Sequence, residues 1–105
     1  MTARERLSNR RACTTFAFQC NGLAYIATVS RYGDDRLAEI FISNAKAGSH
    51  SDAAAKDAAV VCSIALQHNV PVEVIRKALL RDSVGRPSSP LGVALDMIAE
   101  MESPQ

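Results

Sequence analysis

Residues 13–31 read CTTFAFQCNGLAYIATVSR, and this stretch decides the first half of the fold. Two alternating runs flank Asn21-Gly22, the strongest short-range signal for a β-hairpin, because both loop residues need positive φ. A two-residue loop sets the register, which predicts the pairs Cys20–Leu23, Phe18–Tyr25, Phe16–Ala27 and Thr14–Val29. These pairs share one apolar face, so the predicted hairpin has a core side and a more polar side.

A third strand is predicted at 37–43, LAEIFIS, after the turn RYGDDR. Its residues are of the β-branched and aromatic types that suit a pleated surface. Ile40 and Ile42 share the side expected to be buried, whereas Glu39 lies on the other side. If both sides are covered, Glu39 needs a partner such as Arg31 or Arg36, or a backbone donor. If this strand is an exposed edge, it could pair with its copy in a homo-oligomer.

Three helices follow, predicted at about 52–68, at about 71–81 and from Pro90 onward. Ser51 or Asp52 is the expected N-cap of the first, and Ser89 caps the third. Asn69 suits the left-handed residue past a helix end, and Pro71 suits a helix start. The first helix also carries Val60, Val61 and Ile64, which makes it apolar on nearly all sides and predicts a central position.

The element order predicts an α+β domain, with a three-stranded antiparallel sheet of two hairpins followed by three helices packed on one face. A chain of 105 residues holds one domain. We expect a flexible basic N-terminal arm at 1–10 and the domain at 11–102.

The charge balance argues against a global attraction to nucleic acid or membranes, since 12 basic and 11 acidic residues leave a net charge of +1. No run approaches the length of a membrane-spanning helix, so no membrane partner is expected. The arm concentrates Arg4, Arg6, Arg10 and Arg11, which could bind phosphate or be a solvated terminus.

The cysteines, Cys13, Cys20 and Cys62, have neither CxxC nor metal spacing, and their odd number points to a reducing cytoplasm. Cys20 and Cys62 are expected to be buried and inert. No nucleophile–base pair and no phosphate loop stands out, so no catalytic residue and no metal site are predicted.

Two weaker candidate sites remain. Asp34, Asp35 and Glu39 form an acidic cluster without the ligand spacing of a calcium loop. In GRPSSP, residues 85–90, backbone donors and Arg86 beside a helix start could hold an anion, although a plain Ser89 cap is the simpler interpretation.

YGDDRLAEIFISNAKAG at 32–48 and ALQHNVPVEVIRKAL at 65–79 lie on either side of an Ala-rich helix. Together they resemble the "Y-x-D-G-x-L-x-E-I-F-I" and "L-Q-x-G-V-P-L-E-E-F" segments of adenosylcobalamin-dependent (class II) ribonucleotide reductases. This C-terminal region is similar to the TSCPD domain, which also occurs in short stand-alone proteins. The resemblance spans about 9–100, including NRR at 9–11 and RPSSPLGVALDMI at 86–98.

At Asp35 and Asn69 the family pattern has glycine, so this chain departs from the pattern at both positions. It also lacks the cysteine-containing motif for which the domain is named. The resemblance implies a relation to ribonucleoside-diphosphate reductase, an oxidoreductase of deoxyribonucleotide synthesis and DNA replication. This chain is too short for the catalytic barrel and shows no such thiol set. We therefore expect adenosylcobalamin only in the full-length enzyme, with no cofactor bound by this chain.

Three hypotheses follow: an accessory or regulatory module that binds a reductase or a nucleotide without catalysis, a small nucleotide- or nucleic-acid-binding protein that uses the arginines, and a structural homo-oligomer. The residues expected at a ligand or partner surface are Arg10, Arg11, Tyr32, Asp34, Arg36, Glu39, Arg86, Ser88 and Ser89.

Overall fold

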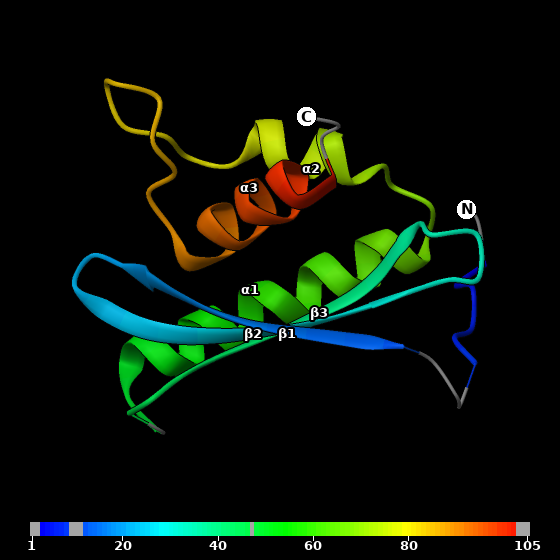
Figure 1. Cartoon of the computed structure of the whole chain (residues 1–105), viewed down its shortest axis with the longest axis horizontal. Helices are drawn as coiled ribbons and strands as arrows, with labels where there is room; N and C mark the ends of the chain where they lie inside the picture. Colours follow the sequence, from blue (N-terminus) through cyan, green and yellow to red (C-terminus); the bar gives the residue numbers. More distant parts are fainter. Residues whose placement is uncertain (1–2, 9–11, 47, 103–105) are drawn as a thin grey trace.

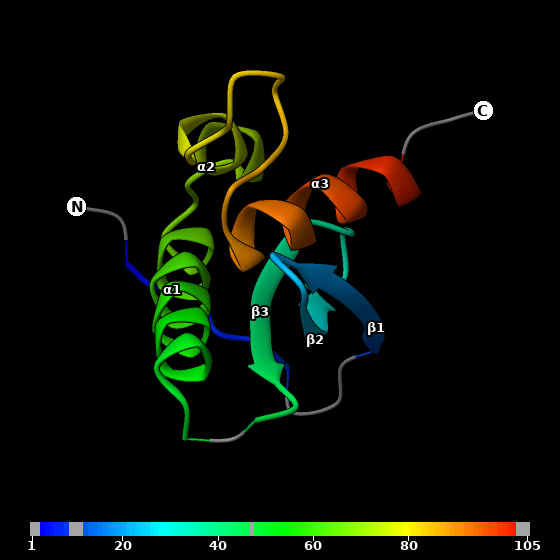
Figure 2. The same cartoon turned by 90° about the vertical axis from the view of Figure 1, so that its left-hand side faces the viewer.

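The computed structural model describes residues 3–8, 12–46 and 48–102 and confirms the α+β class. Three antiparallel strands, β1 (Cys13–Cys20), β2 (Leu23–Arg31) and β3 (Leu37–Asn44), form a sheet in that order. Three helices follow: α1 (His50–Gln67), α2 (Val72–Ala78) and α3 (Pro90–Glu102). Figure 1 shows α3 lying over one face of the sheet, and Figure 2 shows α1 lying beside β3. None of the helices in the described ranges is long and apolar enough to cross a membrane.

The first hairpin has the predicted register throughout, from Cys20 opposite Leu23 to Thr14 opposite Val29. Asn21 and Gly22 have φ values of 53° and 79°, as the two-residue turn requires. In the second hairpin, Asp35 takes the left-handed conformation with φ 70°, so an aspartate stands where the related family has glycine. The Asp34 carboxylate compensates by accepting the Arg36 backbone N–H at 3.3 Å.

The core lies between one face of the sheet and the helices. Its members come from every element except α2: Phe18, Cys20, Tyr25, Ala27, Val29, Leu37, Ile40, Ile42, Ala55, Ala59, Cys62, Leu66, Leu91, Ala94, Leu95 and Ile98. The predicted burial of the isoleucine side of β3 is confirmed, since Ile40 and Ile42 are almost fully buried. The rings of Phe18 and Tyr25, a predicted cross-strand pair, stack with centroids 5.5 Å apart.

α1 covers the outer edge of β3 and satisfies its backbone groups with side chains. The Ser63 hydroxyl accepts from the Ile40 N–H and donates to the Ile40 carbonyl, both at 2.9 Å. The Gln67 amide donates to the Ala38 carbonyl at 3.1 Å. The Asp52 carboxylate accepts from the Asn44 N–H at 3.0 Å. The β3 edge is therefore occupied, and the condition for its pairing with a second copy is not met.

The cap prediction for α1 was wrong, because Ser49 rather than Ser51 or Asp52 is the N-cap. The Ser49 hydroxyl accepts from the Asp52 N–H at 3.1 Å. The Asp52 side chain is instead occupied by the N–H groups of Asn44 and Gly48 and by Lys56. A tertiary contact with β3 thus decides which residue caps the helix.

The central position predicted for α1 was also wrong. Val60, Val61 and Ile64 are 47%, 67% and 41% exposed. Only one side of the helix is covered, and its small residues Ala55 and Ala59 are nearly fully buried there. The exposed valines and isoleucine form an apolar surface rather than a second buried face.

α2 is shorter than the predicted 71–81, because Leu79 turns extended and residues 80–88 fold into a small hairpin-like loop. Pro71 is the N-cap rather than the first helical residue. The predictions for Asn69 and Ser89 are confirmed: Asn69 has φ 66°, and the Ser89 hydroxyl accepts from the Gly92 N–H at 3.2 Å.

Ser63→Ala is expected to lower the free energy of unfolding by about 1–3 kcal/mol, because it leaves the buried N–H and C=O of Ile40 without their partner. Urea unfolding monitored by circular dichroism measures the change. The matched control is Ser43→Ala on the exposed side of β3, where little change is expected. Equal midpoints for the two variants would show that the β3 edge does not depend on Ser63.

Candidate functional site

The turn between β2 and β3 brings together three of the predicted site residues, Tyr32, Asp34 and Arg36. The Arg36 guanidinium donates to Asp34 at 2.8 Å and to Glu5 at 3.0 Å, and its carbon lies 4.7 Å from the centre of the Tyr32 ring. It also donates to the Asn69 side chain at 3.0 Å. We call these five residues the turn cluster. It joins the N-terminal segment, the hairpin turn and the end of α1.

Arg36 pairs with both carboxylates of the turn cluster, Asp34 and Glu5, which leaves the cluster one negative charge in excess. The hydrogen bond from the Arg36 guanidinium lowers the pKa of Asp34, and the bonds that Arg36 donates to Glu5 and Asp34 raise its own pKa. Burial is the main cause that raises the pKa of Tyr32, whose hydroxyl donates to the Glu5 carbonyl at 3.0 Å. Exposed ion pairs of this kind contribute little stability each. The turn cluster therefore positions the chain more than it offers unpaired groups to a ligand.

A hollow of about 650 Å³ lies beside the turn cluster. Its lining mixes basic, acidic and hydroxyl groups: Glu5, Arg6, Ser8, Ala12, Thr14, Val29, Arg31, Tyr32, Gly33, Asp34, Asp35 and Arg36. The volume lies within the range of small-molecule pockets, about 300–1,000 Å³. Such pockets are mostly apolar with a few polar groups, whereas here six of the twelve lining residues are charged.

Glu39 lies on the sheet face opposite the core and is only 7% exposed. The side chains of Arg31 and Arg36, its expected partners, bond elsewhere: Arg31 to Glu102 and the Asp35 carbonyl, Arg36 within the turn cluster. Glu39 still takes part in an interaction and adds to the negative potential at Tyr32. It is therefore an engaged, buried carboxylate and not a solvated edge residue.

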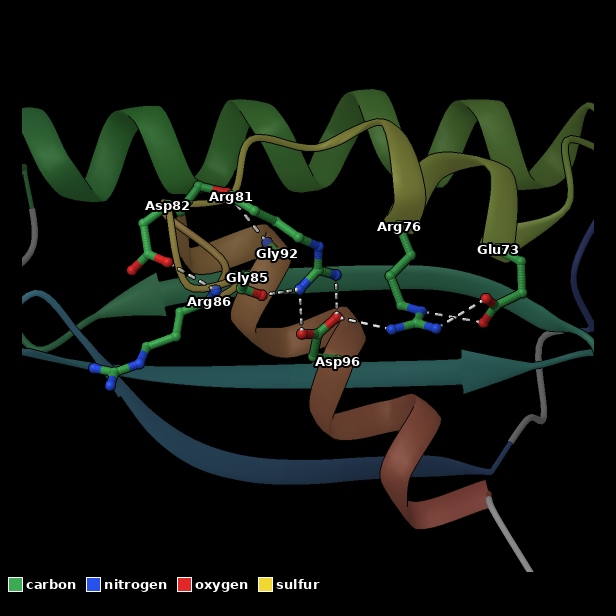
Figure 3. A network of polar contacts seen from close by, with 9 residues as sticks. Glu73, Arg76, Arg81, Asp82, Gly85, Arg86, Gly92 and Asp96 are labelled. Atoms are coloured by element: carbon green, nitrogen blue, oxygen red, sulfur yellow. Dashed lines mark hydrogen bonds and ion pairs between the residues drawn. The ribbon is translucent and has the colours of Figure 1, made fainter.

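Three further predicted site residues, Arg86, Ser88 and Ser89, do not join the turn cluster. Arg86, Ser88 and Ser89 lie in the loop before α3, at the other end of the molecule from the β2–β3 turn (Figure 1). Ser89 acts as a helix cap. The Arg86 guanidinium points away from the neighbouring polar network (Figure 3). The simpler interpretation of this loop, a capped helix start, accounts for these contacts.

The arginine-based hypothesis of nucleotide binding finds little support in the described part of the arm. Arg4 donates to the Gln67 side chain, and the Glu5 N–H donates to the Gln67 carbonyl at 2.7 Å. Arg36 is engaged in the turn cluster. Arg10 and Arg11 lie outside the described residues, as does the predicted boundary between arm and domain, so those expectations stay predictions.

The sequence reasoning missed an ion-pair network that joins α2, the 80–88 loop and α3 (Figure 3). The Asp96 carboxylate accepts from Arg81 at 2.7 and 2.9 Å and from Arg76 at 3.1 Å. Arg76 also pairs with Glu73 at 3.0 Å. Hydrogen bonds from Arg81 are the main cause that lowers the pKa of Asp96. The one available signal was a lone aspartate in the apolar stretch PLGVALDMIAEM.

Thiols and histidines do not assemble into a reactive centre in the part of the chain that the structure describes. No group of three or more His, Cys, Asp or Glu that could hold a metal occurs there. Burial raises the pKa of Cys20 and raises that of Cys62 to about 11, as their predicted burial implies. Cys13 is exposed, with its sulfur 3.2 Å from the Ser30 hydroxyl oxygen.

A second feature that the sequence did not predict is an apolar patch on the face of the sheet opposite the core, called the open face below. Ile26, Phe41 and Val60 are 51%, 50% and 47% exposed and line a common hollow of about 290 Å³. We call these three residues the open-face patch. The sequence contained a signal for this patch, because apolar residues occur on the more polar side of each strand and on a second side of α1. The assumption that α1 is central concealed it.

Residues 2–100 match the TSCPD domain, which is nearly the whole chain. The chain belongs to the TSCPD domain family. It is 39% identical over 72 residues to the vitamin B12-dependent ribonucleotide reductase of Rhodopirellula baltica. That alignment covers 69% of this chain and 7% of the reductase. No solved structure matches.

The two motifs that carry the resemblance meet in this TSCPD domain. Gln67 of the second motif donates to the carbonyl of Ala38 in the first, and Asn69 accepts from Arg36. Asn69 also has the left-handed conformation for which the family pattern uses glycine. These residues therefore hold α1 against β3 and the β2–β3 turn, which gives both motifs a structural role.

Asp96→Asn is expected to lower the free energy of unfolding at pH 7 by about 1–2 kcal/mol, because Arg76 and Arg81 lose their shared carboxylate. The pKa of Asp96 is lowered on folding, so its contribution is present above the ordinary pKa of about 4 and is lost as the pH falls through the lowered value. The variant should therefore lose less stability than the wild type on acidification, as measured by urea unfolding at neutral and acidic pH. Asp57→Asn, at an exposed position of α1, is the control, and an identical pH profile for all three proteins would contradict the role of Asp96.

Proposed function

We propose that this TSCPD domain is an accessory or regulatory module of ribonucleotide reduction, which binds a reductase and does not catalyse the reaction itself. The observation that supports it is the family membership together with the 39% identity to a short part of a B12-dependent reductase. The matched segment is 7% of that enzyme, so its activity as a whole cannot be transferred to this chain.

The chemistry of the described residues supports a binding role. The carboxylates and arginines of the turn cluster and of the Asp96 network bond to one another, so these charged groups are already engaged within the domain. Buried thiols with raised pKa values, such as Cys62, supply little thiolate at neutral pH and are poor redox nucleophiles. Radical reduction needs reactive thiols, which on this proposal the partner reductase supplies.

On this proposal, the partner reductase also binds the adenosylcobalamin. The hollow beside the turn cluster, about 650 Å³ in volume, suits a drug-sized ligand and is small for a corrinoid. Half of the residues that line it are charged, and several of these side chains are already paired, such as Arg36 with Glu5. The residues present do not fit the cofactor, and this chain binds its partner without it.

The open-face patch is the surface proposed for the reductase. Ile26, Phe41 and Val60 form an exposed apolar surface on a rigid sheet and helix, and aromatic residues in such patches dominate many interfaces. The core does not need these side chains, since each is about half exposed. The patch therefore offers binding energy that folding does not use.

The test uses the purified chain and the purified ribonucleotide reductase of the same cell. The wild type is expected to bind, whereas Phe41→Asp should weaken the affinity by about tenfold or more, because it places a charge in an apolar contact. Val84→Asp, at a 69% exposed position in the loop before α3, should bind like the wild type. Isothermal titration calorimetry measures the affinities.

Absence of any binding between the wild-type chain and the reductase would overturn the proposal. Equal binding by both variants would move the docking surface away from the open-face patch. Formation of deoxyribonucleotide by the purified chain with adenosylcobalamin and a dithiol, without a reductase, would contradict the non-catalytic role.

A further inference from the structure

The two edges of the sheet are treated differently in this fold. The outer backbone groups of β3 are occupied by Ser63, Gln67 and Asp52 of α1. β1 is the other edge strand, and along residues 15–19 no described residue outside the sheet bonds to its backbone. One edge is thus closed by a helix, and the other is open along residues 15–19 of the described chain.

The Asn21-Gly22 turn identifies which groups on β1 face outward. A two-residue turn closes on a hydrogen-bonded pair, here Cys20 and Leu23, and hydrogen-bonded and non-bonded positions then alternate along the strand. Thr15, Ala17 and Gln19 therefore direct their N–H and C=O groups away from β2. The same alternation predicts that Ala38, Ile40 and Asn44 face away from β2, where α1 side chains bond to them. The hydrogen bonds at β3 therefore agree with the alternation from which the outward-facing groups of β1 were assigned.

β1 has none of the usual protections of an edge strand. Its sequence, CTTFAFQC, contains no charged residue and no proline, and its pairing with β2 is uninterrupted by a bulge. Natural edge strands commonly carry lysine, proline or a bulge to prevent pairing with another chain. A neutral strand of eight residues that lacks all three is suited to pairing.

An apolar shelf runs beside this open edge on the helix side. α3 packs against β1. Phe16, Ile98 and Met101 form the apolar part of a hollow of about 510 Å³, which Arg31, Asp35 and Glu102 also line, and Met101 is 56% exposed. Met97 is one helical turn from Met101 and only partly buried. A partner that pairs with β1 would also cover this shelf and gain hydrophobic free energy.

We propose that β1 pairs antiparallel with β1 of a second copy, which gives a two-fold symmetric dimer with one continuous six-stranded sheet. An antiparallel strand pair about a two-fold axis is self-complementary, since each outward N–H meets an outward C=O of the other copy. β1 carries no charge that would repel its copy or attract a charged foreign strand. The two apolar shelves approach each other on the same side of the joined sheet. This proposal is independent of the reductase role.

Sedimentation equilibrium of the full chain at increasing concentration tests the dimer. The wild type is expected to reach twice the monomer mass of 11.3 kDa. Ala17→Lys, at an exposed position whose backbone faces outward, should raise the dissociation constant by about tenfold or more, because it places two like charges across the two-fold axis. Ile26→Lys adds the same charge to the same face of the sheet but on the central strand, and should dimerise like the wild type.

Hydrogen exchange supplies a second readout that a folding defect would not imitate. The amides of Thr15, Ala17 and Gln19 should become more protected as the wild-type concentration rises, while those of Ala17→Lys should not. A wild type that stays monomeric at high micromolar concentration overturns the proposal. Dissociation by Ile26→Lys as strong as by Ala17→Lys also overturns it, because that result indicates contact between sheet faces instead of edges.

Discussion

The rest of the structure depends on one contact, the set of side-chain hydrogen bonds by which α1 satisfies the outer edge of β3. Asp52, Ser63 and Gln67 are spaced by whole helical turns and meet Asn44, Ile40 and Ala38 in the opposite chain direction. The distances agree: the helix segment rises about 22 Å at about 1.5 Å per residue, and the strand segment extends about 20 Å at about 3.3 Å per residue. Small residues such as Ala55 and Ala59 allow the helix to approach closely enough.

Local chemistry in the sequence was sufficient to predict the sheet. The Asn21-Gly22 turn and the alternation around it determine the strand register, and Asn69 and Ser89 mark helix ends by their own backbone preferences. These features depend on a few neighbouring residues, so they can be derived without tertiary knowledge. The helix order and the buried side of β3 follow from the same kind of pattern.

The errors arose where a tertiary contact overrides a local preference. Asp52 is a good N-cap type, but β3 and Gly48 take its carboxylate, and Ser49 caps instead. Burial was predicted for Val60, Val61 and Ile64 because apolar side chains usually pack in the core, yet these three are exposed. The predicted site residues fall into two separate groups, because their positions in space depend on the tertiary fold. Tyr32, Asp34 and Arg36 lie together, whereas Arg86 and Ser89 lie at the other end of the molecule. Whether any of them contacts a ligand cannot be derived from pattern.

Because α1 covers the β3 edge, the two edges of the sheet differ in whether they can accept a further strand. Strands from a neighbouring domain, or from elsewhere in a longer polypeptide, can be added at β1 only, since at β3 they would have to displace a helix and three side-chain bonds. A sheet that can be extended from one end alone is well suited to serve as a module, because what is appended there leaves the helix-covered half undisturbed.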